Sequence, residues 1–223
     1  MKLIVANWKS HKTDKEGVEW FQELETLLNT NPITLEKIRE NQIRVVVCPP
    51  FPLLPLLHPL AQPLGIFLGA QNISSHEEGS FTGEVPTLII ADMCQYVIVG
   101  HSERRALFHE TDADIGKKVT LALEQRIEPI VCVRNEEDII PPHASIVAYE
   151  PVAAIGTGNN MRPEEVVAVK ETLLLSQKAL FLYGGSVDPE NASSYLAHQQ
   201  IDGLLIGSAS LDPYQFYTIL REA

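Results

Sequence analysis

The sequence predicts an α/β fold in which eight parallel strands, separated by helices, close into a (β/α)₈ barrel. Short apolar runs rich in β-branched residues alternate with longer stretches whose apolar residues recur at helical spacing. Such alternation is typical of parallel sheets, and eight repeats are the number that a closed barrel of this kind contains. The length of 223 residues suits one barrel, so we expect a single domain over residues 1–223.

The predicted strands are short, as expected for segments that cross a small barrel once. They span Leu3–Ala6, Arg44–Cys48, Ile66–Ala70, Tyr96–Val99, Ile130–Val133, Ile146–Tyr149, Ala179–Tyr183 and Gly203–Ile206. An open doubly wound sheet is the structural alternative. The turn after the first strand lacks GxGxxG, which disfavours the dinucleotide-binding form of that alternative.

Helices are predicted between all neighbouring strands except the fifth and sixth. They lie near Lys15–Leu28, Leu53–Gln62, Pro86–Met93 and Asp112–Arg126, and they begin at Pro163, Pro189 and Pro213. Pro163 suits the first turn of a helix, where a backbone N–H is not required. Residues Arg134–Ser145 include Pro141 and Pro142 and leave room for at most a short helical turn, so the fifth helix is expected to be reduced or absent.

Composition excludes several classes of protein. A hydrophobic fraction of 45% with 21% charged residues is typical of globular chains rather than disordered ones. The net charge of −12 argues against a nucleic-acid partner. No apolar stretch approaches the roughly 18 residues of a membrane span, so no membrane partner is expected. Cys48, Cys94 and Cys132 are scattered and form no CxxC pair, which favours a reducing cytoplasm.

Candidate catalytic residues follow three of the predicted strands, at the carboxyl ends where such barrels carry their active sites. Asn7 and Lys9 follow the first strand, His101 and Glu103 the fourth, and Glu150 the sixth. Together they provide a cation, an imidazole and carboxylates for acid–base chemistry. Taken alone, Lys9, His101 and Glu150 are each better explained as ordinary solvated side chains.

The protonation of two of these residues can be anticipated from their expected surroundings. Partial burial at the barrel mouth would raise the pKa of Glu150 and make it a usable base. If Ser102 opens a helical turn, the field at that helix start would keep the His101 imidazole neutral.

Two glycine-containing turns predict a phosphate site. Gly184-Gly185-Ser186 follows the seventh strand and Gly207-Ser208 the eighth, where backbone N–H groups can approach an anion. Gly156 is a candidate hinge of a closing loop, although an ordinary connector is equally compatible. No HExxH, CxxC or clustered histidine pair is present, so no metal is expected.

These residues lie in stretches that resemble the triosephosphate isomerase family in its bacterial form. The matching stretches are Asn7–Lys9, Gly79–Glu84, Gly100–Arg105, Tyr149–Val152, Ala154–Gly158 and Tyr183–Val187, in the order of the family and over nearly the whole chain. The resemblance implies a TIM barrel that interconverts dihydroxyacetone phosphate and D-glyceraldehyde 3-phosphate in glycolysis and gluconeogenesis. It implies no cofactor and no metal.

The resemblance also implies a role for each candidate residue. Glu150 would be the base that moves a proton between two carbons, and His101 the electrophile that polarises the carbonyl oxygens. Lys9 would hold the substrate and its enediolate, with Asn7 beside it and Glu103 as its carboxylate partner. The phosphate would contact Gly156, Ser186, Gly207 and Ser208. The loop Gln71–Glu84 resembles the one that docks into a partner subunit, which implies a homodimer.

Three departures from the family pattern keep alternatives open. Ala153 stands where the lid normally carries a tryptophan, Arg134-Asn135 replaces a Gly-Glu pair, and Ser208 replaces the second of two glycines. The chain is also shorter than the about 250 residues of a typical barrel. A degenerate barrel that binds a phosphate ligand or a partner is therefore an alternative. A phosphosugar aldolase would need a Schiff-base lysine at a later strand end, and none is found there.

Overall fold

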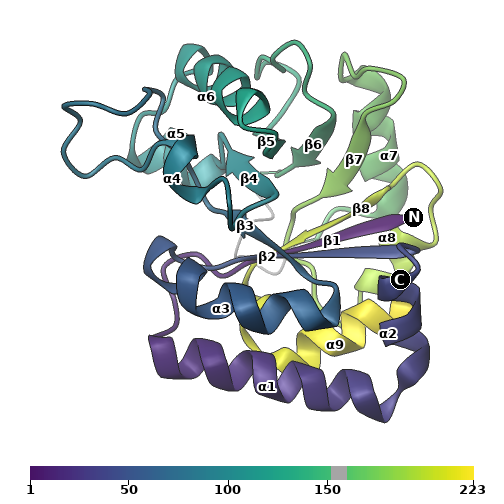
Figure 1. The fold of residues 1–223 in the computed structure, drawn as a ribbon. Helices are drawn as coiled ribbons and strands as arrows, with labels where there is room; N and C mark the ends of the chain where they lie inside the picture. Colours follow the sequence, from purple (N-terminus) through teal and green to yellow (C-terminus); the bar gives the residue numbers. More distant parts are fainter. Residues whose placement is uncertain (152–159) are drawn as a thin grey trace.

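A closed barrel of eight parallel strands forms the centre of the molecule, which is a computed structural model that describes residues 1–151 and 160–223 (Figure 1). The strands follow one another in sequence order, and the eighth pairs with the first. They are β1 (Lys2–Asn7), β2 (Ile43–Cys48), β3 (Phe67–Ala70), β4 (Tyr96–Val99), β5 (Glu128–Val133), β6 (Ile146–Tyr149), β7 (Leu180–Tyr183) and β8 (Gly203–Ile206). The predicted TIM barrel is confirmed.

The alternation of side chains along each strand explains how the barrel is filled. Successive strand residues point to opposite faces, so every second residue enters the interior. The interior set consists of Leu3, Val5, Val46, Cys48, Tyr96, Ile98, Ile130, Cys132, Ile146, Ala148, Leu182 and Leu205. The intervening residues, such as Ile4 and Val45, belong to a second cluster that includes the buried faces of the helices. Because both strand faces are buried, the strands read as continuous apolar runs.

The outer layer consists of helices that connect the strands. They are α1 (Asp14–Thr30), α2 (Pro32–Arg39), α3 (Leu54–Ala61), α4 (Thr87–Ile90), α5 (Ser102–Leu107), α6 (Asp112–Glu124), α7 (Pro163–Thr172), α8 (Ala192–Leu196) and α9 (Pro213–Glu222), with 3₁₀ turns η1 (Phe51–Leu53), η2 (Gln62–Leu64) and η3 (Ser208–Leu211). Helix α1 begins with a capping box, in which the Thr13 hydroxyl accepts the Glu16 N–H and the Glu16 carboxylate accepts the Thr13 N–H. Helix α2 was not expected from the sequence.

One predicted helix start is wrong. The helix expected from Pro189 begins three residues later, at Ala192. The Asp188 carboxylate accepts the N–H groups of Glu190 and Asn191, and the Asn191 side chain accepts the N–H of Asp188. These side-chain contacts hold the chain in a turn, because Asp and Asn compete with the helical hydrogen-bond pattern.

The fifth unit lacks its helix, as predicted. Residues 134–145, all of which the structure describes, form turns and extended segments between β5 and β6. In the chain, α6 precedes β5 and α7 follows β6, so β5 and β6 are joined without a helix (Figure 1). Among the described residues, no helix combines the length and apolar character that crossing a membrane requires.

Candidate active site

Strand periodicity continues past the strand ends and selects which residues face the barrel mouth. On β1 the interior positions Leu3 and Val5 are followed by Asn7, and on β6 Ile146 and Ala148 are followed by Glu150. Asn7 and Glu150 are therefore the next inward positions of their strands. Both side chains are buried and line one cavity of about 390 Å³ at the carboxyl ends.

Lys9 reaches the same cavity because the chain around it is anchored on both sides. The Trp8 indole is fully buried and packs edge-on against Trp20 of α1, with ring centroids 5.0 Å apart. The Gln71 side chain donates to the carbonyl oxygens of Lys9, at 2.8 Å, and of Cys48. Lys9 itself adopts a positive φ of 51°, a conformation that non-glycine residues rarely adopt and that surrounding contacts must hold.

The Lys9 ammonium is paired with a carboxylate from another strand end. Its Nζ lies 2.6 Å from Glu103 Oε1, and both side chains keep partial contact with solvent. Glu103 is the second residue of α5, where a negative side chain is favoured by the helix dipole. This ion pair holds the lysine tip beside the cavity.

His101 departs from strand periodicity, and a glycine accounts for the departure. The inward position of β4 after Tyr96 and Ile98 is Gly100, which has a φ of 71°. A Cβ at this position would lie 2.7 Å from the Ile115 side chain, so only glycine fits without a shift. The turn at Gly100 places His101 at the start of α5, with its side chain in the cavity.

The hydrogen bonds of His101 define its tautomer. Nδ1 accepts the backbone N–H of Glu103 at 3.2 Å, and Nε2 lies 2.9 Å from Glu150 Oε1. Because accepting a hydrogen bond uses the lone pair of Nδ1, the ring in this arrangement is neutral and carries its proton on Nε2. The imidazole thus presents one N–H donor to the cavity.

The pKa of His101 does not move in the expected direction. Burial acts to lower it, but the Glu150 carboxylate and, more weakly, Glu103 act to raise it, and the pKa lies above its usual value. The helix start at Ser102 is present as predicted, but the Glu150 carboxylate beside the imidazole acts to raise the pKa. The sequence could not indicate that Glu150 lies within hydrogen-bond distance.

The pKa of Glu150 is also shifted against expectation. Burial acts to raise the pKa, but His101 and the Ser102 N–H, which donates to Oε2 at 2.8 Å, stabilise the carboxylate more strongly. The pKa of this carboxyl therefore lies below its usual value, and the expectation of a raised pKa is wrong. Both carboxylate oxygens are occupied by donors from the fourth unit, so Glu150 is ionised in this arrangement.

The two glycine-containing turns line the opposite side of the cavity. Gly184, Ser186, Gly207 and Ser208 all contribute to its wall. A Cβ at position 184 would lie 3.1 Å from Glu150 Cγ, so this glycine allows close approach of β7 to the carboxylate. Ser208 is not among the residues with positive φ, so replacing glycine there imposes no backbone strain. Gly156 and Ala153 lie outside the described residues.

Several cavity residues were not anticipated from the sequence. The cavity wall also contains Val187, Asp188 and Gln215. Outside the wall, the Gln71 side chain donates a hydrogen bond to the backbone carbonyl of Lys9. Gln71 is the first residue after a strand, which is the signal that could have identified it. Gln215 lies on α9, and no strand-end rule points to a helix residue. Among the described residues, no group of three or more His, Cys, Asp or Glu side chains is arranged to hold a metal ion.

Comparison with known proteins agrees with this geometry. A family model described as triosephosphate isomerase matches residues 2–223. Among curated proteins, the triosephosphate isomerase of Thermus thermophilus is 37% identical over 255 aligned positions, which cover 99% of this chain and 98% of that protein. That of Aquifex aeolicus is 38% identical and that of Hahella chejuensis 37%, with 98% or more of each chain covered.

The alignments are longer than the 223 residues of this chain, so the chain lacks residues that these relatives have. The match nevertheless runs from one end of the barrel to the other. The chain therefore belongs to the triosephosphate isomerase family.

Proposed function

We propose that the protein interconverts dihydroxyacetone phosphate and D-glyceraldehyde 3-phosphate by proton transfer through an enediolate. The observation that carries this proposal is the convergence of Lys9, His101 and Glu150 on one cavity, although they are far apart in the sequence. A carboxylate, a neutral N–H donor and an ammonium group are the parts that moving a proton next to a carbonyl requires. The family membership of the chain supports the same reaction.

Glu150 acts as the base in this proposal. It removes a proton from C1 of dihydroxyacetone phosphate, and the electron pair of that C–H bond forms the C1–C2 double bond of the enediolate. At the same time the π electrons of the C2 carbonyl move to its oxygen. Return of the proton to C2, together with transfer of the hydroxyl proton from O1 to O2, gives the aldehyde at C1, with no net change in protons. In the described arrangement the carboxylate oxygens are held by His101 and Ser102, so the substrate must displace these contacts before transfer begins.

His101 and Lys9 stabilise the oxygen atoms on which negative charge develops. The Nε2–H of a neutral imidazole can turn from Glu150 to a substrate oxygen without a change of protonation. The Lys9 ammonium adds a positive charge, and its contact with Glu103 holds it in place before the substrate arrives. Donors that are already oriented need little reorganisation in the transition state, and this is the main source of their effect on rate.

The phosphate group fits the side of the cavity formed after β7 and β8. Ser186, Gly207 and Ser208 line this side, and η3 starts at Ser208, so that backbone N–H groups there are candidates to bind the anion. Gly156 completes the set that the family resemblance implies. A chain with a net charge of −12 can still bind an anion through such local donors.

A coupled assay tests the reaction. Glyceraldehyde 3-phosphate is supplied, and the dihydroxyacetone phosphate formed is reduced by glycerol-3-phosphate dehydrogenase while NADH absorbance is followed. We expect turnover that is abolished to near background in the Glu150→Gln variant. Folded wild-type protein with turnover no greater than the reaction without enzyme would reject the proposal.

We further propose that the protein is a homodimer that assembles through the loop Gln71–Glu84. The segment between β3 and α4 projects from the barrel (Figure 1), and it carries Phe81, which stacks on His76 and is 41% exposed. Exposed apolar side chains on the two helices after β3 and β4, such as Ile89 and Leu107, support an interface near this loop.

Sedimentation velocity tests the assembly. The wild type is expected to sediment at twice the monomer mass and Phe81→Glu to shift toward monomer. Leu174→Glu, at an exposed position on another part of the chain, serves as the control and should remain dimeric. A wild type that is monomeric at all concentrations would contradict the dimer.

We also propose that residues 1–223 form a single domain. The closure of β8 onto β1 supports a single folding unit.

We propose in addition that the protein works in the cytoplasm, in glycolysis and gluconeogenesis. Cys48, Cys94 and Cys132 are all free and buried, which supports a compartment that does not favour disulfides.

A further inference from the structure

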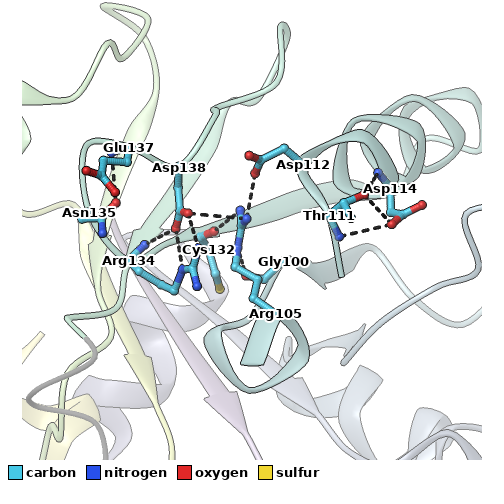
Figure 2. A network of polar contacts seen from close by, with 10 residues as sticks. All are labelled: Gly100, Arg105, Thr111, Asp112, Asp114, Cys132, Arg134, Asn135, Glu137 and Asp138. Carbon is cyan, nitrogen blue, oxygen red and sulfur yellow. Dashed lines mark hydrogen bonds and ion pairs between the residues drawn. The ribbon is translucent and has the colours of Figure 1, made fainter. Parts of the chain in front are cut away.

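Four charged side chains form a connected network where the fifth helix is absent. Arg105 Nη1 lies 2.7 Å from Asp112 Oδ1 and 3.6 Å from Asp138 Oδ1. Asp138 also receives two hydrogen bonds from the Arg134 guanidinium, at 2.6 and 3.0 Å (Figure 2). Two cations and two anions therefore compensate one another between α5, the start of α6 and the segment after β5.

Asp138 lies at the centre of this network and is buried. Only 4% of its side chain is exposed, as is also the case for Arg105. Burial acts to raise the pKa of Asp138, but hydrogen bonds from Arg134 and the charge of Arg105 hold it below its usual value. A buried charge persists only when it is paired, and these two side chains face each other while each also has a closer partner, Asp112 for Arg105 and Arg134 for Asp138.

Asp138 also binds the peptide group that supports Glu150. Its Oδ2 accepts the backbone N–H of Arg134 at 2.7 Å. The carbonyl of the same peptide group, that of Val133, accepts the backbone N–H of Glu150 at 2.8 Å. Because a peptide group is planar, holding its N–H fixes the direction of its carbonyl. A single peptide group, between Val133 and Arg134, therefore connects the Asp138 carboxylate to the backbone N–H of Glu150.

Arg105 binds the peptide group that supports His101. Its Nε donates to the carbonyl oxygen of Gly100 at 2.9 Å, and the N–H of that peptide belongs to His101. Its Nη2 donates to the carbonyl of Cys132 on β5. Figure 2 shows Arg105 between Gly100, Cys132 and Asp138. One side chain therefore connects the ends of β4 and β5 directly beneath the histidine.

We propose that Asp138 is a positioning residue that sets the relative placement of His101 and Glu150, through Arg105 on one side and the Val133–Arg134 peptide on the other. This inference rests on the proposed isomerase function. The network also contacts the backbone at the end of β5, where Arg105 donates to the Cys132 carbonyl and Asp138 accepts the Arg134 N–H.

Asp138→Ala removes both connections, and Glu137→Ala is the matched control. Glu137 is an exposed carboxylate one residue earlier in the same turn. In Asp138→Ala we expect kcat to fall about 10-fold to 100-fold, because displacements of about 1 Å in a catalytic group have effects of that size. KM should change little, since the phosphate-binding turns follow β7 and β8. Glu137→Ala should retain the kcat of the wild type.

A second readout does not depend on catalysis. Hydrogen exchange of the Glu150 amide, followed by NMR, should be faster in Asp138→Ala and unchanged in Glu137→Ala. A variant with a lower melting temperature but wild-type kcat at 25 °C and an unchanged Glu150 amide would overturn the proposal, because Asp138 would then only stabilise the fold.

Asp138→Asn tests the contact with the Arg134 N–H separately from the charge contact with Arg105. It also replaces the alanine variant if that variant does not fold. Its side-chain oxygen can still accept the Arg134 N–H, whereas its charge no longer compensates Arg105. We expect a kcat between those of the wild type and Asp138→Ala, with altered His101 ring signals. Unchanged kcat and unchanged signals would reject the role of the charge. A wild type without isomerase activity would reject the proposed function, whereas the exchange and ring-signal measurements would still report on positioning.

Discussion

The barrel has a cavity at each end, and the two cavities have similar volumes. The same strands contribute residues to both, but the polar side chains in the two cavities make different kinds of contact. The cavity at the carboxyl ends measures about 390 Å³ and the one at the amino ends about 440 Å³. β1 contributes Asn7 to the first and Leu3 to the second, and β6 contributes Glu150 and Ile146. Both cavities contain cations and carboxylates, so composition alone does not distinguish them.

The difference lies in how the polar groups are used. At the amino ends Arg44 donates to the Tyr96 hydroxyl at 3.1 Å, and the Ser145 hydroxyl donates to Glu128. These contacts join side chains of the amino-end cavity into pairs. At the carboxyl ends, turns and helix starts orient Lys9, His101 and Glu150 toward a shared space. Loops after the strands therefore make one mouth reactive, whereas the other contributes to stability.

The largest effect is expected from moving the base. Glu150→Asp withdraws the carboxylate by one methylene while its charge remains, and we expect kcat to fall about 100-fold to 1,000-fold because proton transfer depends on placement. Steady-state kinetics and circular dichroism measure the loss and the retained fold. Glu128→Asp makes the same change at the amino mouth and should leave kcat unaltered. Equal losses of kcat in the two variants would contradict the assignment of catalysis to the carboxyl mouth alone.

Removal of the imidazole donor should have the next largest effect. His101→Asn takes away the Nε2–H that reaches Glu150 and, in the proposed reaction, the substrate oxygen. Loss of one such donor lowers kcat by about 100-fold. His58→Asn, on α3 and away from both mouths, is the control. A His101→Asn enzyme with nearly wild-type kcat would mean that other donors stabilise the enediolate.

The pH dependence of stability should distinguish the reactive mouth. The pKa of Glu150 is lowered in the folded state, so its ionisation stabilises the fold above the unfolded pKa, near 4.5. That contribution is lost as the pH falls through the lower folded pKa. The difference in unfolding free energy between the wild type and Glu150→Gln, measured with urea from pH 7 to pH 3, should therefore shrink on acidification. A difference that is constant or grows toward low pH would contradict the assigned shift.

The smallest effect is expected at the amino mouth. Arg44→Met removes the hydrogen bond to Tyr96 and the contact of the guanidinium with the Phe67 ring. We expect a loss of about 1 kcal/mol in unfolding free energy, the usual size for one hydrogen bond, and no change in kcat. Denaturant unfolding and the coupled assay measure the two quantities. A fall in kcat without a fall in stability would show that the amino mouth also acts on the reaction.

The strands, their order and most of the residues that meet in the cavity could be predicted from local sequence patterns. Hydrophobic runs and strand ends are local signals, and in a parallel barrel all strand ends of one kind meet at one mouth. Asn7 and Glu150 are predicted because each directly follows a predicted strand. The absence of the fifth helix was also predictable, because Pro141 and Pro142 interrupt a segment that is too short for one.

The directions of the pKa shifts and the contacts that support the site depend instead on the folded barrel. Glu150 and His101 shift each other's pKa because their side chains lie 2.9 Å apart, a distance that no local pattern encodes. The link from Asp138 to His101 through Arg105 likewise joins residues from separate units of the barrel. Electrostatic effects depend on distance and burial in space, and these quantities exist only after the chain has closed the barrel.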